Sequence, residues 1–262
     1  MIEERDSHRV ERDGPLTIIT INRPHVANAL HPDASWELAE AFDQFSADPN
    51  QWVAIITGAG DRSFCAGTDL KYRASFGREP LPASGFAGLT KRFDLDKPVV
   101  AVVNGAAFGG GFELALACDI IIASEHARFG LTEVTHGQAA LGGGIQRLAR
   151  ATNQRVAMEL VLTGRQLTSK EALQLNIVNA VVEHKDLDMT ARRWVKKILE
   201  AAPLAVRASK QTLLRGLDEP SLAAALDNQE YYPAVKRLRA SKDAKEGIRA
   251  FSEKRRPNWS GH

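Results

Sequence analysis

The sequence of 262 residues has little cysteine, little net charge and no long hydrophobic run, and each shortage argues against a class of protein. Its two cysteines, Cys65 and Cys118, stand far apart and show no C-x-x-C spacing. This pattern argues against a disulfide framework and against a cysteine-based metal site. We therefore expect free thiols, a reducing compartment and no bound metal.

Net charge is nearly absent, because 34 lysines and arginines face 32 aspartates and glutamates, a formal balance of +2. A nucleic-acid-binding domain ordinarily carries a marked basic excess. The short basic runs at 236–237 and 254–256 are typical of solvated faces. We expect no nucleic-acid partner.

Long hydrophobic runs are also missing, since no apolar stretch approaches the roughly 18 residues that cross a bilayer. The first six residues, MIEERD, are charged and have no apolar signal region. We expect a soluble, cytoplasmic protein with no membrane partner. The length suits one large domain, or one domain with a small appendage.

The most informative stretch that is present runs from Asp96 to Asp119. Residues 99–103 form an apolar, β-branched run typical of a buried strand, which breaks into a loop ending in glycines 109–111. Residues 112–118 are rich in alanine and leucine and predict a helix. The glycines therefore stand where main-chain N–H groups have no helical partner and can receive an anionic oxygen. Glu113 adds a carboxylate in the first helical turn.

An ordinary strand-to-helix turn also uses glycine for close packing, and it is the alternative interpretation of this loop. Three consecutive glycines favour use of the backbone itself, because each costs roughly 1 kcal/mol in a helix or strand. A dinucleotide site fits less well, since residues 105–110 do not give G-x-G-x-x-G.

The rest of the chain alternates strands and helices up to residue 150 and is mainly helical beyond it. Glu133 precedes a second glycine cluster at 142–144, so two glycine loops frame two glutamates. The segment 72–91 has no clear periodicity, and it is either a mobile lid with a short helix or an inert surface loop. The expected strands are 16–21, 53–57, 99–103, 120–123 and 177–182, and the expected later helices are 155–162, one from Ser169, 187–199, 203–216, 222–232 and 244–251.

Five pieces carry a family resemblance: Asn22 to Pro24 with Asn28 to Leu30, and the stretches 64–70, 104–119, 129–133 and 251–255. Together they resemble the crotonase superfamily, the enoyl-CoA hydratase/isomerase group. Within it, residues 85–90, 109–113 and 257–261 are similar to the branch that acts on carnitinyl-CoA and crotonobetainyl-CoA.

The resemblance implies an α/β fold. Residues 1–200 would form a crotonase-like spiral core of repeated ββα units in two roughly perpendicular sheets. Residues 201–262 would form a C-terminal helical region that drives assembly into a homotrimer or a dimer of trimers. Plain packing of these helices within one chain is the alternative.

The resemblance also assigns the chemistry. The main-chain N–H groups of Thr68 and Gly110 would hold the thioester carbonyl oxygen as an oxyanion hole. Glu133 would exchange a proton with the α-carbon, and Glu113 would hold and activate the water. Each residue has a simpler alternative, because Thr68 can be a turn residue and a glutamate at a helix start complements the dipole.

Coenzyme A would be part of the substrate, so no separate cofactor is expected. The family pattern assigns its pantetheine and adenine to a set of residues in the first bend, with two more reaching a neighbouring subunit's nucleotide. The first set is Ala66, Gly67, Asp69, Leu70 and Lys71, and the second is Phe251 and Lys254. Either lysine can equally be an ordinary solvated side chain.

Residues 137–142, Gly-Gln-Ala-Ala-Leu-Gly, lack the proline that many hydratases carry there, so the acyl pocket differs from theirs. Tyr72, Phe76 and Phe86 are the aromatic candidates for contact with a quaternary ammonium group. His136, three residues after Glu133, is a candidate wall residue. The leading interpretation is a 2-enoyl-CoA hydratase. An enoyl-CoA isomerase or another enolate reaction, and a non-catalytic acyl-CoA-binding homologue, are the alternatives.

Overall fold

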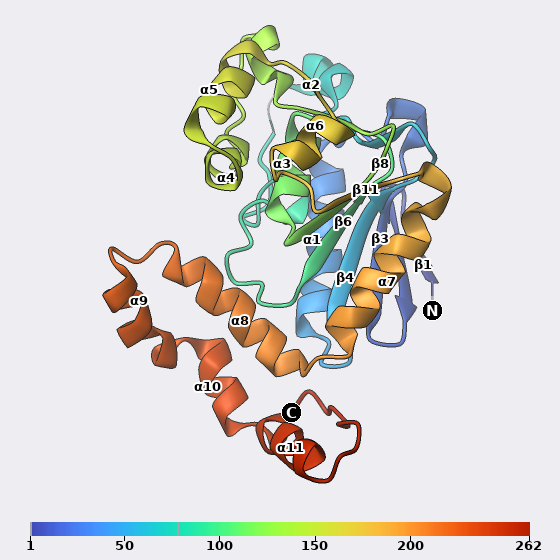
Figure 1. Cartoon of the computed structure of the whole chain (residues 1–262). Coiled ribbons are helices and arrows are strands. Elements are labelled where there is room, and N and C mark those ends of the chain that lie inside the picture. Colours follow the sequence, from blue (N-terminus) through green and yellow to red (C-terminus); the bar gives the residue numbers. More distant parts are fainter. Residues whose placement is uncertain (1, 78) are drawn as a thin grey trace.

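The computed structural model describes residues 2–77 and 79–262. Met1 and Arg78, which belong to the predicted core and to the 72–91 segment, lie outside the described residues. A seven-stranded sheet forms the centre, with the strand order β1-β2-β3-β4-β6-β8-β11 (Figure 1). Its strands are β1 (Ile2–Glu4), β2 (His8–Asp13), β3 (Leu16–Ile21), β4 (Val53–Gly58), β6 (Val99–Val103), β8 (Ile120–Ser124) and β11 (Ala180–Val182).

The strands β3, β4, β6, β8 and β11 pair parallel with one another, whereas β2 pairs antiparallel with β3 and with the edge strand β1. Parallel strands are covered on both faces and are therefore apolar throughout. Every residue of β6 is buried, as its run of valines and alanine predicts.

A second sheet of four short strands has the order β10-β9-β7-β5. The strands β5, β7 and β9 are parallel, and β10 pairs antiparallel with β9. Their bounds are β5 (Ser63–Cys65), β7 (Ala106–Phe108), β9 (Arg128–Gly130) and β10 (Leu167–Thr168).

Three consecutive units each give one strand to the large sheet, the next strand to the small sheet, and then a helix. The strands β4 and β5 lead into α2, β6 and β7 into α3, and β8 and β9 into η3. Because neighbouring units pair in both sheets, their strand-to-helix loops are neighbours too. This confirms the two-sheet α/β fold that the resemblance implies. The helices of this part are η1 (Pro24–Val26), α1 (Pro32–Ala47), α2 (Leu70–Phe76), η2 (Phe86–Gly88), α3 (Gly110–Ala117), η3 (Thr132–His136), α4 (Gly144–Ala151), α5 (Gln154–Thr163), α6 (Ser169–Gln174), η4 (His184–Asp186) and α7 (Leu187–Leu199).

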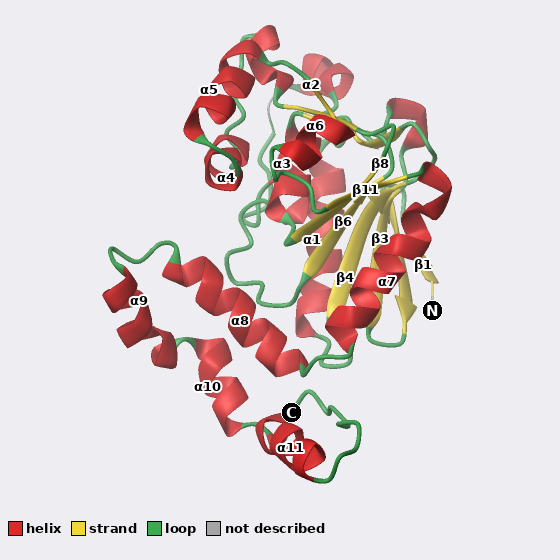
Figure 2. Ribbon diagram, in the orientation of Figure 1, coloured by secondary structure: helices red, strands yellow, loops and turns green. Residues whose placement is uncertain are grey.

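The large sheet separates two apolar clusters. On one face α7 packs its Leu187, Ala191 and Val195 against side chains of β4, β6 and β8, as Figure 2 shows for the ribbon. On the other face α1 and α3 pack with the small sheet, and the largest buried side chains there include Phe42, Phe64 and Phe112.

The C-terminal helices form an arm that extends away from the sheets (Figure 1). It comprises α8 (Pro203–Gly216), α9 (Leu222–Asn228), η5 (Gln229–Tyr231), α10 (Pro233–Ala240) and α11 (Lys242–Ser252). Ion pairs attach it to the core: Arg207 Nε lies 2.8 Å from Asp96 Oδ1, and Lys210 Nζ lies 2.7 Å from Asp119 Oδ2. Five leucines of α8 and α9 and of the turn between them are exposed. They are Leu213, Leu214, Leu217, Leu222 and Leu226.

Sequence patterns missed the strands β1 and β2, all four strands of the small sheet (β5, β7, β9 and β10) and the helix α10, and they extended β11 three residues too far toward the N-terminus. Of the segment 72–91, the first residues continue α2 and residues 85–90 are buried in the core, so the latter part is not a surface loop. Among the residues that the structure describes, no helix is both long and apolar enough to cross a bilayer.

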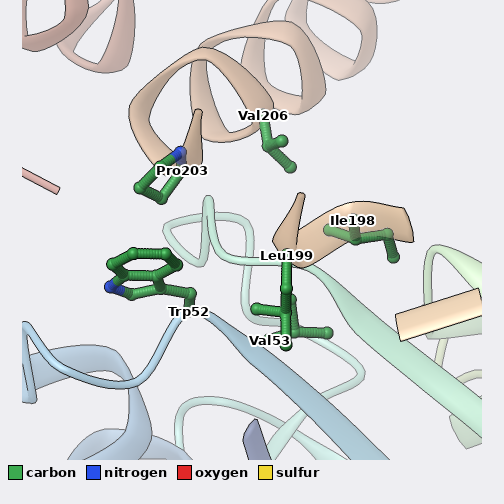
Figure 3. A pocket seen from close by; sticks show the side chains of 6 residues that line it. All are labelled: Trp52, Val53, Ile198, Leu199, Pro203 and Val206. Atoms are coloured by element: carbon green, nitrogen blue, oxygen red, sulfur yellow. The ribbon is translucent and has the colours of Figure 1, made fainter. Parts of the chain in front are cut away.

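Figure 3 shows a small cavity where the end of α7 meets the start of α8. It is lined by Trp52, Val53, Ile198, Leu199, Pro203 and Val206, and its volume is about 10 Å³. That is room for about one water molecule. None of the site residues predicted from the sequence lines it.

Candidate active site

Each of the three glycines at the start of α3 stands where a side chain would clash or the backbone would be strained. A Cβ at Gly111 would lie 1.9 Å from the carbonyl oxygen of Cys65. Gly109, the residue before the helix, has φ of 51°, in the left-handed region that favours glycine. A Cβ on Gly110 would meet the ring of Phe86, so the packing alternative accounts for all three glycines. Gly110 in addition contributes the N–H group of interest.

The N–H of Gly110 lies beside the bend that carries Thr68. A Cβ built on Gly67 would lie 3.0 Å from Gly110 N. Thr68 forms a parallel bridge with Leu30, in which Leu30 N–H donates to Gly67 O and Asp69 N–H donates to Leu30 O. In such a bridge the N–H of the central residue points to the opposite side.

Neither the N–H of Thr68 nor that of Gly110 donates a hydrogen bond within residues 2–77 and 79–262. Two neighbouring main-chain donors are thus available to an oxygen atom. Phe86 of η2 closes one side, because a Cβ on Gly110 would lie 2.9 Å from its Cζ. The sequence identified Phe86 only as a candidate for aromatic contact with a quaternary ammonium group.

The Glu113 carboxylate is buried, with 5% of the residue exposed, and it lies in the second glycine cluster. The N–H of Gly144 donates to Glu113 Oε1 at 2.9 Å. Burial raises the pKa of Glu113, whereas hydrogen bonds from Gly144 and Gly142 and the positive charge of Arg147 act to lower that pKa. The net result is a pKa of the Glu113 carboxyl above its ordinary value.

Glu133 stands on η3, and its carboxylate lies at the other side of the α3 start. A Cβ on Gly109 would lie 3.2 Å from Glu133 Oε1. Its Oε2 is buried and has no hydrogen-bond partner among the described residues. Burial raises the pKa of Glu133, and the charge of Glu113 raises that pKa further. Two carboxyl groups that disfavour joint ionisation can act as an acid and a base in one reaction.

Arg147 of α4 is a further residue near Glu113, and sequence patterns did not single it out. Its Nη2–H donates to the carbonyl oxygen of Thr90 at 2.8 Å, and its guanidinium lies over the ring of Phe93. It therefore ties the glycine cluster that holds Glu113 to the segment that carries Phe86. Its position three residues after the cluster is the only signal in the sequence.

Of the residues assigned to coenzyme A, Asp69 has structural partners. Its Oδ1 accepts the N–H of Tyr72, capping α2, and its Oδ2 lies 3.3 Å from Arg23 Nη1. Leu70 and Lys71 are exposed in the first turn of α2, and Ala66 and Gly67 stand in the bend before it.

Phe251 and Lys254 lie in the part of the arm that Figure 1 shows far from α3, so one chain does not bring them to the glutamates. Phe251 is 87% exposed. His136 is exposed on η3. In the described part of the chain, no group of three or more histidine, cysteine, aspartate or glutamate residues could hold a metal ion.

Comparison with known proteins gives consistent findings. The family profile described as "Enoyl-CoA hydratase/isomerase" matches residues 11–262. A protein named carnitinyl-CoA dehydratase from Salmonella arizonae is 45% identical over 98% of this chain and 99% of its own length.

Solved structures agree in fold. An enoyl-CoA hydratase from Mycobacterium tuberculosis superposes with a TM-score of 0.91 at 39% identity, covering 98% of this chain and 100% of that one. A carnitinyl-CoA hydratase from Mycobacterium avium superposes with a TM-score of 0.77 at 41% identity, covering 99% of this chain and 100% of that one.

Proposed function

This chain belongs to the enoyl-CoA hydratase/isomerase family, and on that premise we propose that it catalyses the reversible addition of water to a 2-enoyl-CoA thioester. The observation that carries the proposal is the pair of glutamates at one helix start. Glu113 stands in the first turn of α3, and the carboxylate of Glu133 lies beside Gly109. The neighbouring N–H of Gly110 donates no hydrogen bond to any of the described residues. A hydration needs this combination of a base, an acid and an oxyanion site.

The N–H groups of Thr68 and Gly110 hold the thioester carbonyl oxygen. Negative charge grows on this oxygen as the enolate forms, and preorganised main-chain dipoles stabilise it without rearranging. One such donor is worth about 3 kcal/mol, or roughly a hundred- to a thousandfold in rate. The ring of Phe86 packs against Gly110 and fixes the position of this donor.

The two glutamates divide the proton transfers. Ionised Glu113 accepts a proton from water while the water oxygen bonds to the β-carbon. The π electrons of the double bond move onto the α-carbon and the carbonyl. Protonated Glu133 then gives its proton to the α-carbon, so the net change is one water added. Proton exchange with solvent restores both glutamates, and the same steps reversed dehydrate the product.

The names of the relatives make crotonobetainyl-CoA, which hydrates to carnitinyl-CoA, the first functionalised ester to test. Isomerisation of the double bond needs one carboxylate that moves a proton between carbons. The retention of two carboxylates at the helix start, buried Glu113 and half-buried Glu133, favours hydration over isomerisation.

We assign residues 201–262 to self-association, into a trimer or two stacked trimers. The support is the set of exposed leucines on the arm, which a monomer leaves in water. In such an assembly Phe251 and Lys254 reach the nucleotide bound by a neighbouring subunit, whereas residues 66–71 contact the coenzyme A of their own chain.

The experiment is a steady-state panel of 2-enoyl-CoA esters of increasing length, including crotonobetainyl-CoA and a 3-enoyl-CoA. Disappearance of the enoyl absorbance with formation of the 3-hydroxyacyl-CoA supports the proposal. Conversion of the 3-enoyl ester alone shows an isomerase. Binding of acetoacetyl-CoA with no turnover of any ester shows a non-catalytic homologue.

A further inference from the structure

A hydrogen bond joins the helix that follows Thr68 to the loop that follows Glu133. On α2, Arg73 Nη1–H donates to Gln138 Oε1 at 3.0 Å. The main-chain N–H of Gln138 in turn donates to the carbonyl oxygen of Glu133 at 3.0 Å. Arg73 therefore stands at the side of the site where the bend of the oxyanion donor and the loop of the acid approach each other.

Within residues 2–77 and 79–262, no carboxylate lies within ion-pair distance of Arg73. Its side-chain acceptor there is the neutral amide of Gln138, so the charge of Arg73 has no counter-charge in the described part of the chain. A guanidinium offers five N–H donors in a planar fork that fits a carboxylate. Arg73 is half-buried and Gln138 is exposed, so the guanidinium is open to a ligand from solvent.

The aromatic side chains of α2 are directed elsewhere. The ring of Tyr72 stacks on His31, at the start of α1, with ring centres 5.1 Å apart, and Phe76 packs on Tyr72. Tyr72 Oη–H donates to Glu79. The grouping of rings and a carboxylate that would attract a quaternary ammonium thus faces α1, whereas the face toward the Glu133 loop carries a cation.

In the proposed reaction the thioester oxygen lies at Thr68 and Gly110, and the reacting carbons lie beside Glu133. The acyl chain beyond the β-carbon therefore continues past Glu133, toward the loop that Arg73 reaches. We propose that Arg73, held by Gln138, binds an anionic group at the end of the acyl chain. The substrate class is a 2-enoyl-CoA that carries a distal carboxylate, and a trimethylammonium group is disfavoured. This inference rests on the proposed function.

The test compares three esters of similar length: glutaconyl-CoA with a carboxylate, crotonobetainyl-CoA with a cation, and crotonyl-CoA as the uncharged reference. For the wild type we expect kcat/KM to rank the carboxylate ester first and the cationic ester last. Arg73→Gln should lower the glutaconyl-to-crotonyl ratio about 30-fold, as loss of a charge-assisted hydrogen bond does. Arg73→Lys should recover part of it.

Arg155→Gln is the matched control, because Arg155 is exposed on α5, and it should keep the wild-type ratio. A wild-type preference for crotonobetainyl-CoA, or a ratio that Arg73→Gln does not change, overturns the inference. The phosphates of coenzyme A are the other source of an anion. If Arg73→Gln weakens the binding of crotonyl-CoA but not that of crotonyl-pantetheine, the anion at Arg73 is a phosphate of coenzyme A. The assignment of Arg73 to the acyl chain is then wrong.

Binding of saturated esters separates this inference from the proposed function. Glutaryl-CoA, butyryl-CoA and γ-butyrobetainyl-CoA cannot be hydrated, so calorimetric Kd values report recognition without chemistry. Tighter binding of glutaryl-CoA that Arg73→Gln removes supports the inference even if no enoyl ester turns over. Equal Kd values for the three esters contradict it, even where the hydratase activity is found.

Discussion

The main-chain N–H of Gly144 donates a hydrogen bond of 2.9 Å to Oε1 of Glu113 in the protein interior. A Cβ on Gly142 would lie only 2.4 Å from Oε2 of the same carboxylate. The second glycine cluster is therefore shaped around the Glu113 side chain, which it both contacts closely and hydrogen-bonds. This contact gives a direct way to displace the carboxylate without removing it.

Gly142→Ala should lower the rate of crotonyl-CoA hydration by about a hundredfold, because displacing a catalytic group by about 1 Å has an effect of that size. The added methyl group pushes Glu113 away from Gly144. Initial rates and the Kd for acetoacetyl-CoA measure the two effects. Gly216→Ala, whose Cβ would meet only Ala225 at 3.7 Å, is the control and should retain full activity.

Glu133→Gln should lower kcat for hydration by roughly 10² to 10⁴, because the amide cannot transfer a proton to the α-carbon. The Kd for acetoacetyl-CoA should remain close to that of the wild type, since shape is kept. Exchange of the α-proton of the saturated thioester with deuterium should be lost in parallel. Turnover at the wild-type rate would remove Glu133 from the mechanism.

The same substitution should also change how stability depends on pH. Burial raises the pKa of Glu133, and so the folded protein holds this proton more tightly than the unfolded chain. The contribution of this proton to the stability of the fold is fully present below the ordinary glutamate pKa. It is lost as pH rises through the raised pKa of the folded protein. Glutamine cannot ionise, so Glu133→Gln should exceed the wild type in Tm at pH 7 and lose that advantage toward pH 4. If the Tm advantage of Glu133→Gln grew on acidification, the pKa of Glu133 would not be raised by folding.

Most of the core could be predicted from the sequence because its strands are continuous apolar runs. The strand β6 and the helix α3 follow from such local patterns. The strand β2 alternates buried His8 and Val10 with charged neighbours, and β10 has two residues, so neither carries a recognisable run. Both form only because a neighbouring strand supplies hydrogen-bond partners.

The candidate site also has a part that the sequence predicts and a part that it does not. Glu113 and Glu133 could be identified as candidates because each accompanies a glycine cluster nearby in the sequence. The bonds of Arg73 to Gln138 and of Arg147 to Thr90 join residues 65 and 57 positions apart. No local spacing encodes such pairs, so only the folded chain brings them together.

Arg147→Gln tests the electrostatic role of one of these long-range residues. The charge of Arg147 lowers the pKa of Glu113, and the variant should therefore raise that pKa. The limb of the kcat/KM profile that requires ionised Glu113 should move to higher pH, with Arg147→Lys in between. A purely structural loss would lower the rate without moving the limb. Arg155→Gln, exposed on α5, should keep the wild-type profile.

The arm offers a test of assembly that is independent of catalysis. Leu217 and Leu222 are 66% and 77% exposed at the turn between α8 and α9, and apolar side chains of this size are ordinarily covered. Leu217→Glu combined with Leu222→Glu should shift the mass measured by light scattering from a trimer, or a multiple of it, to a monomer, because burying two carboxylates is costly. Lys185→Glu, a charge change on an exposed residue of η4 outside the arm, is the control. If Phe251 and Lys254 act on a neighbour's nucleotide, the monomeric variant should also bind acetoacetyl-CoA more weakly than acetoacetyl-pantetheine relative to the wild type. If the wild-type protein is monomeric at all concentrations, the assignment of residues 201–262 to self-association is wrong, and these helices pack only within one chain.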